Sequence, residues 1–207
     1  MAGPAAAETH DEGDGRLSAN SGFGGFVVDA PVHHAYWASF GEWALCDTAR
    51  DDGTPPDTIT ITGVRYVIGK HKPLEVRTYL RRVTPHQVKS HPKKPEGAYS
   101  PFIGLLGRPP HFDQRYANHK WTAPGHYTHE VAGTTVTRGC DETLTDAYAD
   151  ENGDIPKHAW TSLVLAVKTG RNDARIPRTL VDYTVGDTPH TLRIAWTVGG
   201  QGYRLHH

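Results

Sequence analysis

The chain of 207 residues contains only two cysteines, Cys46 and Cys140, which lie far apart in the sequence. Neither belongs to a CxxC motif or to the Cys/His spacing of a zinc site. Two isolated cysteines in a β-rich chain favour one long-range disulfide bond, which constrains the fold by joining distant segments. Disulfides persist in oxidising compartments, so the pair also predicts an extracytoplasmic protein, either secreted or in a cell envelope. The alternative is a cytoplasmic domain with two free thiols and a structural role.

Turn residues divide the chain into short segments, because it contains 22 glycines and 15 prolines. Between the turns lie segments rich in β-branched and aromatic residues, with alternating polarity. These predict an all-β fold, a two-sheet antiparallel sandwich of immunoglobulin-like type, as a single domain over residues 21–207. The candidate strands are 26–28, 33–46 with a bulge at Gly41, 58–68, 74–83, 134–138, 143–148, 160–169, 179–185 and 191–198.

The alternation within 74–83 predicts one buried and one solvent-facing side, with Leu80 inside and Tyr79 and Arg81 outside. Trp160 and Trp196 are predicted to fill the core. Asn-Gly within 150–154 indicates a hairpin turn, and Gly186-Asp187 indicates another between the last two strands.

Residues 1–20 contain mainly Ala, Gly and acidic residues, with one Leu. Such a segment gains too little from burial to offset the entropy of ordering, so a disordered tail is predicted. It also lacks the basic and apolar regions of a signal peptide, so export would need a leader outside this sequence. No apolar run approaches the ~18 residues of a transmembrane helix, so no transmembrane segment is expected.

Residues 84–130 are predicted to form a long, irregular, Pro- and His-rich loop, either a binding element or a cap on the sandwich. They belong to a basic region, because residues 58–130 carry 12 basic and 4 acidic side chains. This charge favours an anionic envelope polymer, a lipid surface or another envelope protein as the partner. The alternative is a solvated loop face that the protein's own acidic N-terminal third complements. No nucleic-acid-binding module is recognisable, so nucleic acid is not the expected partner. The candidate contact residues are Arg81, Arg82, Lys93, Lys94 and Trp121.

Histidine is unusually frequent, with 14 residues. Four of them, His111, His119, His126 and His129, lie in or beside one aromatic-rich segment. Neutral imidazole binds Zn²⁺ or Cu²⁺, so a metal-binding protein or a metal-dependent enzyme is the alternative function. The spacing matches no HExxH motif, and polar histidines on the loop surface are the expected explanation of the pattern.

The segment 163–198 alternates regularly and resembles the closing strands of small exported bacterial β-sandwich domains of the envelope and lipoprotein type. This resemblance implies an extracytoplasmic domain without an assigned activity. It carries no catalytic residue to this chain. The sequence also contains no GxSxG, GxxxxGK[ST] or GxGxxG motif, so we expect a binding domain without catalytic residues.

Overall fold

The structure is a computed structural model that describes residues 12–13, 15–19, 24–30, 32–50, 57–90, 98–113 and 123–203. Strands dominate these residues, and the two α-helices among them are short. The all-β class is therefore confirmed. The strands form sheets of five, six, three and two strands, so the two-sheet immunoglobulin-like arrangement is not confirmed.

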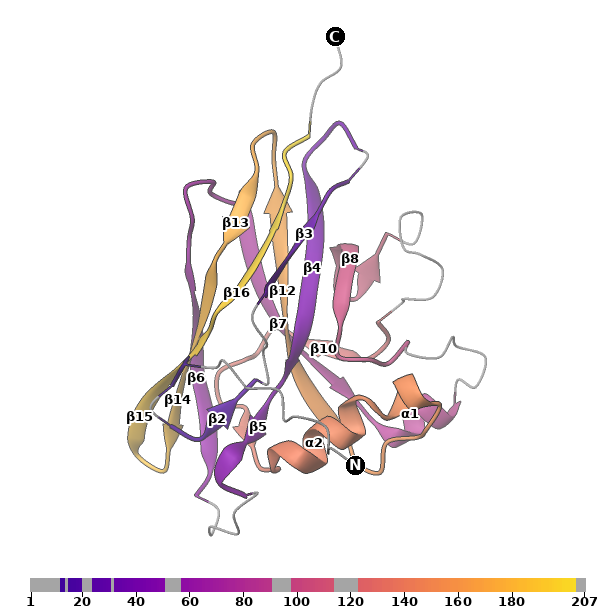
Figure 1. Cartoon of the computed structure of the whole chain (residues 1–207), viewed down its shortest axis with the longest axis vertical. Coiled ribbons are helices and arrows are strands. Elements are labelled where there is room, and N and C mark those ends of the chain that lie inside the picture. The colour runs from indigo at the N-terminus through magenta and orange to yellow at the C-terminus, as the bar shows by residue number, and fades with distance from the viewer. Residues whose placement is uncertain are drawn as a thin grey trace, which may run out of the picture.

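The largest sheet is antiparallel and has the order β10-β7-β12-β4-β8-β9 (Figure 1). Its centre is β12 (Trp160–Thr169), which pairs along its length with β7 (Glu75–Val83) and β4 (Tyr36–Ala44). The pairing of β12 with β4 shifts between Leu163 and Val164, opposite Gly41, so the predicted bulge is confirmed. The outer strands are β8 (Ile103–Arg108), β9 (His111–Phe112) and β10 (His126–Thr128).

The second sheet has the order β1-β15-β14-β6-β11. Its main strands are β6 (Ile59–Val67), β14 (Arg178–Val185) and β15 (Thr188–Ile194). Gly186, with a positive φ of 56°, makes the tight hairpin turn between β14 and β15 that Gly186-Asp187 predicted. The edges are the two-residue strands β1 (Glu12–Gly13) and β11 (Thr135–Val136).

Two small sheets connect the larger ones. One contains β13 (Ala174–Ile176), β16 (Trp196–Gly200) and β3 (Gly24–Val28), and the other pairs β2 (Leu17–Ser18) with β5 (Cys46–Asp47). The helices α1 (Pro85–Ser90) and α2 (Cys140–Ala147) lie together at one end of the molecule, with the β6–β7 and β12–β13 connections at the other (Figure 1). Two 3₁₀ turns, η1 (Thr48–Arg50) and η2 (Ala149–Asn152), complete the described elements.

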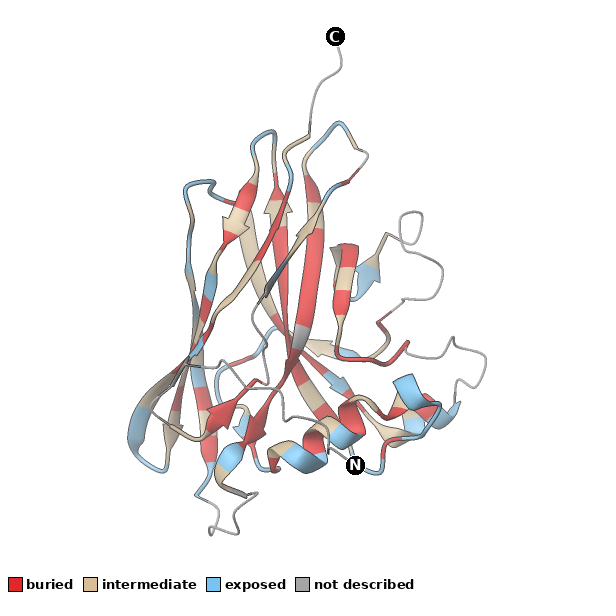
Figure 2. Cartoon of the chain, in the orientation of Figure 1, coloured by how far each residue is buried: buried red, intermediate tan, exposed pale blue. Residues whose placement is uncertain are grey.

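The main hydrophobic core lies between the two larger sheets, and Figure 2 shows the buried stretches of their strands. Both sheets contribute aliphatic and aromatic side chains at alternate positions of the strands. The six-stranded sheet provides Phe40, Trp43, Leu80, Leu163, Leu165 and Val167. The five-stranded sheet provides Ile59, Ile61, Val181, Tyr183, Leu192 and Ile194. Trp160 is buried as predicted, although in a second cluster, and Trp196 is only partly buried against the main core.

The predicted strand over 143–148 is wrong, because these residues belong to helix α2 and the turn that follows it. Two acidic residues in the first turn, Asp141 and Glu142, favour a helix by interacting with its dipole. Thr143, Asp146 and Ala147 are buried at the i, i+3 and i+4 spacing of one helical face. The hairpin predicted over 150–154 is also wrong, because Gly153 ends η2 in the left-handed conformation with φ 75°.

The predicted disordered tail is wrong for residues 12–13 and 15–19, which form β1 and β2 on either side of Gly15 and Arg16. Leu17 pairs with Asp47, and its backbone N–H donates a hydrogen bond to the hydroxyl of Tyr183 over 3.3 Å. These strands join two different sheets, so the segment gains enough pairing and burial to become ordered.

The segment 84–130 is not irregular throughout, since it contains α1, β8, β9 and β10. Part of it covers the outer face of β7, where Ala123, Phe112 and Tyr127 pack around Tyr79. The solvent-facing side predicted for β7 is therefore wrong in its second half, where Tyr79 and Arg81 are buried.

Candidate functional site

A pocket of about 450 Å³ lies between the six-stranded sheet, β11 and helix α2. Its volume falls within the range of ligand-binding pockets in proteins. The wall is formed by the start of β12, the end of β7, the strand β11 with its flanking residues, and one turn of α2. Its lining residues are Leu45, Arg82, Gly133, Thr134, Thr135, Val136, Thr137, Arg138, Thr143, Ala159, Trp160 and Thr161.

Hydroxyl groups are the most frequent polar groups of this wall. Thr134, Thr135 and Thr137 come from β11 and its flanks, Thr161 from β12 and Thr143 from α2. The Thr143 hydroxyl is buried and has no hydrogen-bond partner within the described part of the chain. A buried hydroxyl without a partner costs about 1–3 kcal/mol.

Arg82 is the exposed cation of the pocket, and no ion pair joins it to another described residue. Across the sheet it lies opposite His126 of β10 and Thr161 of β12. Its guanidinium group keeps its positive charge throughout the physiological pH range. Arg82 therefore makes this end of the sheet attractive to anions.

Arg138 is the second arginine of the wall, and acidic residues of α2 fix its position. Its Nη1 lies 2.8 Å from Oδ2 of Asp146, and its Nη2 lies 3.3 Å from Oε2 of Glu142. Asp146 also accepts a 2.6 Å hydrogen bond from the backbone N–H of Lys157. Burial by itself raises the pKa of Asp146, but the hydrogen bonds from Lys157 and Arg138 outweigh burial, and the pKa lies below its ordinary value.

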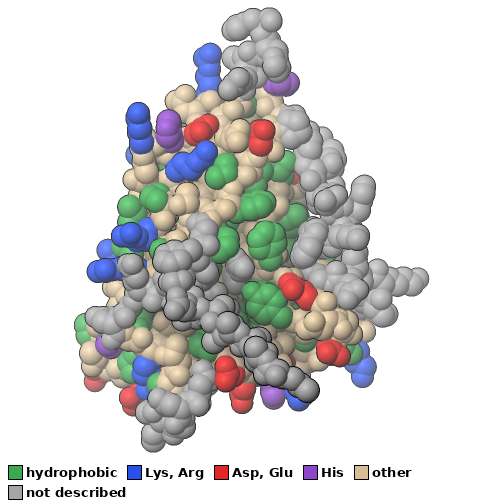
Figure 3. Space-filling view, viewed as in Figure 1, with side chains coloured by type: hydrophobic (Ala, Val, Ile, Leu, Met, Phe, Trp, Pro, Cys, Tyr) green, Lys and Arg blue, Asp and Glu red, His purple; other side chains and the backbone are tan. Residues whose placement is uncertain are grey.

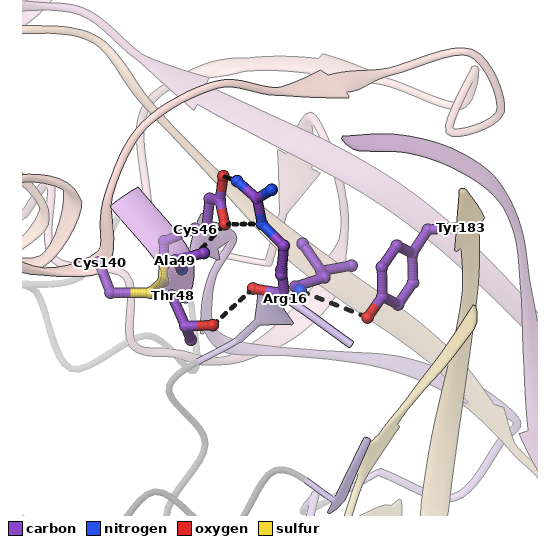
Figure 4. Close-up of a disulfide and its surroundings, with 8 residues drawn as sticks. Arg16, Cys46, Thr48, Ala49, Cys140 and Tyr183 are labelled. Carbon is purple, nitrogen blue, oxygen red and sulfur yellow. Dashed lines mark hydrogen bonds and ion pairs between the residues drawn. A yellow bond between two sulfur atoms is a disulfide. The ribbon is translucent and has the colours of Figure 1, made fainter. Parts of the chain in front are cut away.

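The disulfide bond between Cys46 and Cys140 lies beside the pocket, because the lining residue Leu45 directly precedes Cys46 and the lining residue Thr143 lies on α2 with Cys140. Figure 4 shows the bond and its surroundings. It connects β5 to the first residue of α2, with 4.8 Å between the Cα atoms. The predicted pairing is confirmed, and it joins a strand to a helix, because Cys46 lies on β5 and Cys140 begins α2. No cysteine of the described chain is free.

Arg81 and Arg82, both predicted as partner contacts, have opposite environments. Arg81 is fully buried, and its Nε and Nη2 donate hydrogen bonds of 3.0 and 2.9 Å to the carbonyl oxygen of Pro124. Its Nη1 donates a 2.5 Å hydrogen bond to the Ser100 carbonyl, and its Cζ lies 5.3 Å from the Trp160 ring centroid. Burial lowers the pKa of Arg81. The side chain connects β7 to the 84–130 segment and is not exposed to a partner.

The predicted histidine ligands do not converge where the structure describes them. His126 lies on β10, where its neighbour Tyr127 packs against Tyr79 on the outer face of the sheet. Alternation along the strand therefore directs His126 to the other face, while the ring of His129 lies 4.0 Å from that of Tyr79. His111 is exposed on β9.

Within the described ranges, no group of three or more His, Cys, Asp or Glu residues is arranged to hold a metal ion. His119 lies outside the described residues, as do Lys93, Lys94 and Trp121. The zinc or copper site therefore stays a prediction, which metal analysis of tag-free protein would test.

Of the polar residues that line the pocket, the sequence patterns indicated Arg82 but not the threonines or Arg138. The available signal was the run 134–138, TTVTR, in which threonines precede an arginine. We interpreted this run only as a short strand. Thr143 and Thr161 also line the pocket, but they lie on α2 and β12, which only the fold places beside the 134–138 run.

Comparisons with protein-family models, curated proteins and solved structures found no match to this chain. Neither α-helix of the described residues is long and apolar enough to cross a membrane. The function must therefore be argued from the geometry of the pocket and the surface.

Proposed function

We propose that this protein is an extracytoplasmic, non-enzymatic binding domain for an anionic, hydroxyl-rich partner, such as an acidic polymer of a cell envelope. The observation that carries the proposal is the pocket wall, in which threonines share the lining with Arg82, an arginine without an ion pair to a described residue. Threonine hydroxyls both donate and accept hydrogen bonds and so match sugar or polyol hydroxyls. The guanidinium fork of arginine matches a carboxylate or phosphate group.

The segment 84–130 lies next to Arg82 through its strand β10, which pairs with β7, and this position supports its role in contacting the partner. His126 of β10 lies directly opposite Arg82 in the sheet register. A polymer that places one acidic group in the pocket would extend past β10 onto this segment. The basic character of residues 58–130 favours the same kind of partner.

The extracytoplasmic location is supported by the disulfide, because such bonds persist in oxidising compartments. The likeness to immunoglobulin-like envelope domains belongs to this proposal as well. It rests on the alternation over residues 163–198 in the sequence, together with the antiparallel pairing of β12 with β7 and of β14 with β15.

Isothermal titration with three oligomers tests the proposal: an oligogalacturonate, a poly(glycerol phosphate) and a neutral oligogalactoside. We expect saturable binding of an acidic oligomer, weakened by salt, and none of the neutral one. The two acidic oligomers distinguish carboxylate from phosphate recognition.

The decisive variant is Arg82→Ala, and Arg193→Ala is its matched control, since Arg193 is an exposed arginine of β15 outside the pocket lining. Arg82→Ala removes a charged hydrogen bond worth about 1.5–3 kcal/mol. The Kd for the acidic oligomer should therefore rise roughly 10- to 150-fold. Arg193→Ala should bind as the wild type does. Equal losses in both variants, or no binding of either acidic oligomer, would show that the pocket is not the site.

A further inference from the structure

The β6–β7 connection presents apolar side chains to solvent at the end of the molecule opposite α2. Four large hydrophobic residues are exposed among the described residues, and three of them flank this connection. Val67 is 39% exposed, Ile68 40% and Leu74 63%, whereas the fourth, Ile155, follows η2 near the helices. Exposed apolar residues gathered at one place mark an interaction surface more often than scattered ones do.

Backbone hydrogen bonds hold this connection in place. The Gly69 N–H donates to the Arg175 carbonyl over 3.1 Å, and the Arg175 N–H donates to the His71 carbonyl over 2.9 Å. The Leu74 N–H donates to the Lys168 carbonyl over 2.9 Å. The apolar side chains are thus presented by a fixed backbone, which lowers the entropy lost when they bind a surface.

Basic side chains surround these apolar residues. Lys70 and Lys72 lie within the connection itself, and Arg171 is exposed on the adjacent β12–β13 connection. None of these three has an ion pair with a described residue. The nearby acids are already paired, Asp173 with Arg175 at 3.3 Å and Glu75 with Arg77 at 2.6 Å. Figure 3 shows blue side chains at the upper left of the molecule, where Figure 1 shows these connections.

We propose that the segment 67–74 docks onto the surface of an anionic lipid bilayer. Val67, Ile68 and Leu74 enter the boundary between headgroups and acyl chains, while Lys70, Lys72 and Arg171 contact anionic headgroups. Each Lys or Arg near such a surface raises partitioning roughly fivefold, so the binding is peripheral and reversible. The pocket lies beside α2, at the other end of the molecule, so it stays open when the segment is docked.

Cosedimentation with vesicles tests this surface. The wild-type protein should partition onto vesicles of phosphatidylcholine mixed with phosphatidylglycerol, and much less onto phosphatidylcholine alone. The double variants Ile68→Asp/Leu74→Asp and Lys70→Ala/Lys72→Ala should each lose at least about tenfold in partitioning. Because the altered side chains are exposed, both variants should unfold at the wild-type temperature.

The matched control is Ile155→Asp, which removes the other exposed hydrophobic residue and should partition as the wild type does. Wild-type protein that stays in solution with anionic vesicles would overturn the proposal, as would equal losses in the control and the loop variants. Complete competition by soluble glycerol phosphate at the same headgroup concentration would also overturn it, since the ligand would then be a free headgroup and not a surface.

Discussion

Arg16 and Asp47 form a two-point ion pair immediately beside the disulfide bond (Figure 4). The Nη2–Oδ2 distance is 2.7 Å and the Nε–Oδ1 distance 3.1 Å. Asp47 is fully buried and also accepts a hydrogen bond from the backbone N–H of Ala49. The Thr48 N–H donates to the Arg16 carbonyl over 2.9 Å. These contacts bind the N-terminal segment to the same element that the disulfide fixes.

Replacing Arg16 should therefore destabilise the whole domain. Arg16→Met removes the guanidinium partner of a buried carboxylate, and we expect a loss of about 3–5 kcal/mol in the free energy of unfolding, measured with urea. The double variant Arg16→Met/Asp47→Asn leaves no unpaired carboxylate at this position and should recover part of this loss. A double variant no more stable than the single one would contradict the assigned ion pair.

Removing the disulfide should lower stability without changing the secondary structure. The bond joins residues 94 positions apart. We therefore expect the free energy of unfolding of Cys46→Ser/Cys140→Ser to be lower by about 2–5 kcal/mol. Urea unfolding with and without reductant gives the value, while circular dichroism checks the strands. Thiol titration of unfolded wild-type protein should find no free thiol until reductant is added, and two reactive thiols would contradict both the bond and the proposed location.

The adjacent residues Arg81 and Arg82 offer a matched pair of substitutions on one strand. Arg81→Met leaves the carbonyl oxygens of Pro124 and Ser100 without their buried donors. We expect a loss of about 2–5 kcal/mol in the free energy of unfolding, since each buried group without a partner costs about 1–3 kcal/mol. Arg82→Ala should change stability by less than about 0.5 kcal/mol, because its side chain is exposed. Similar losses in both variants would contradict the buried position of Arg81.

The ion pair of Arg138 and Asp146 should make stability depend on pH in the acid range. The pKa of Asp146 is lowered in the folded protein, so its contribution is fully present above the unfolded value of 3.8. It is lost as the pH falls through the lower pKa of the folded state. Asp146→Asn should lower stability at pH 7 by about 1–3 kcal/mol and weaken its fall between pH 4 and pH 2.

Asp182 provides the comparison for this pH dependence. The hydrogen bond from Arg65 lowers its pKa as well, but Arg65 is exposed on the surface of β6. Because solvent screens such a pair, Asp182→Asn should lower the free energy of unfolding by less than about 1 kcal/mol. Urea unfolding of both variants over a pH series measures the difference. If the stability of Asp146→Asn falls between pH 4 and pH 2 as steeply as that of the wild type, the protonation of this carboxylate is not coupled to folding.

Local sequence patterns predicted the strands that have strong alternation and clear turns. β6, β12 and β14 lie close to their predicted ranges, because their β-branched residues favour extended backbone and bury one face. The single strand predicted over 191–198 is wrong, because this range is divided between β15 and β16, which belong to different sheets. The same patterns failed for α2, where Thr143 and Leu144 look like a strand. The burial of one helical face in the fold, together with the acidic residues of the first turn, makes this segment a helix.

The sequence by itself determined the β class, the central strands and the cysteine pair, because alternation, turns and lone cysteines are local or compositional properties. Only the tertiary structure decided that Arg81 is buried while Arg82 faces the pocket, and that Arg16 reaches Asp47. Those environments depend on which distant segments pack on each face of β7 and β5. Contacts between residues far apart in the chain leave no periodic signal, so a single sequence does not reveal them.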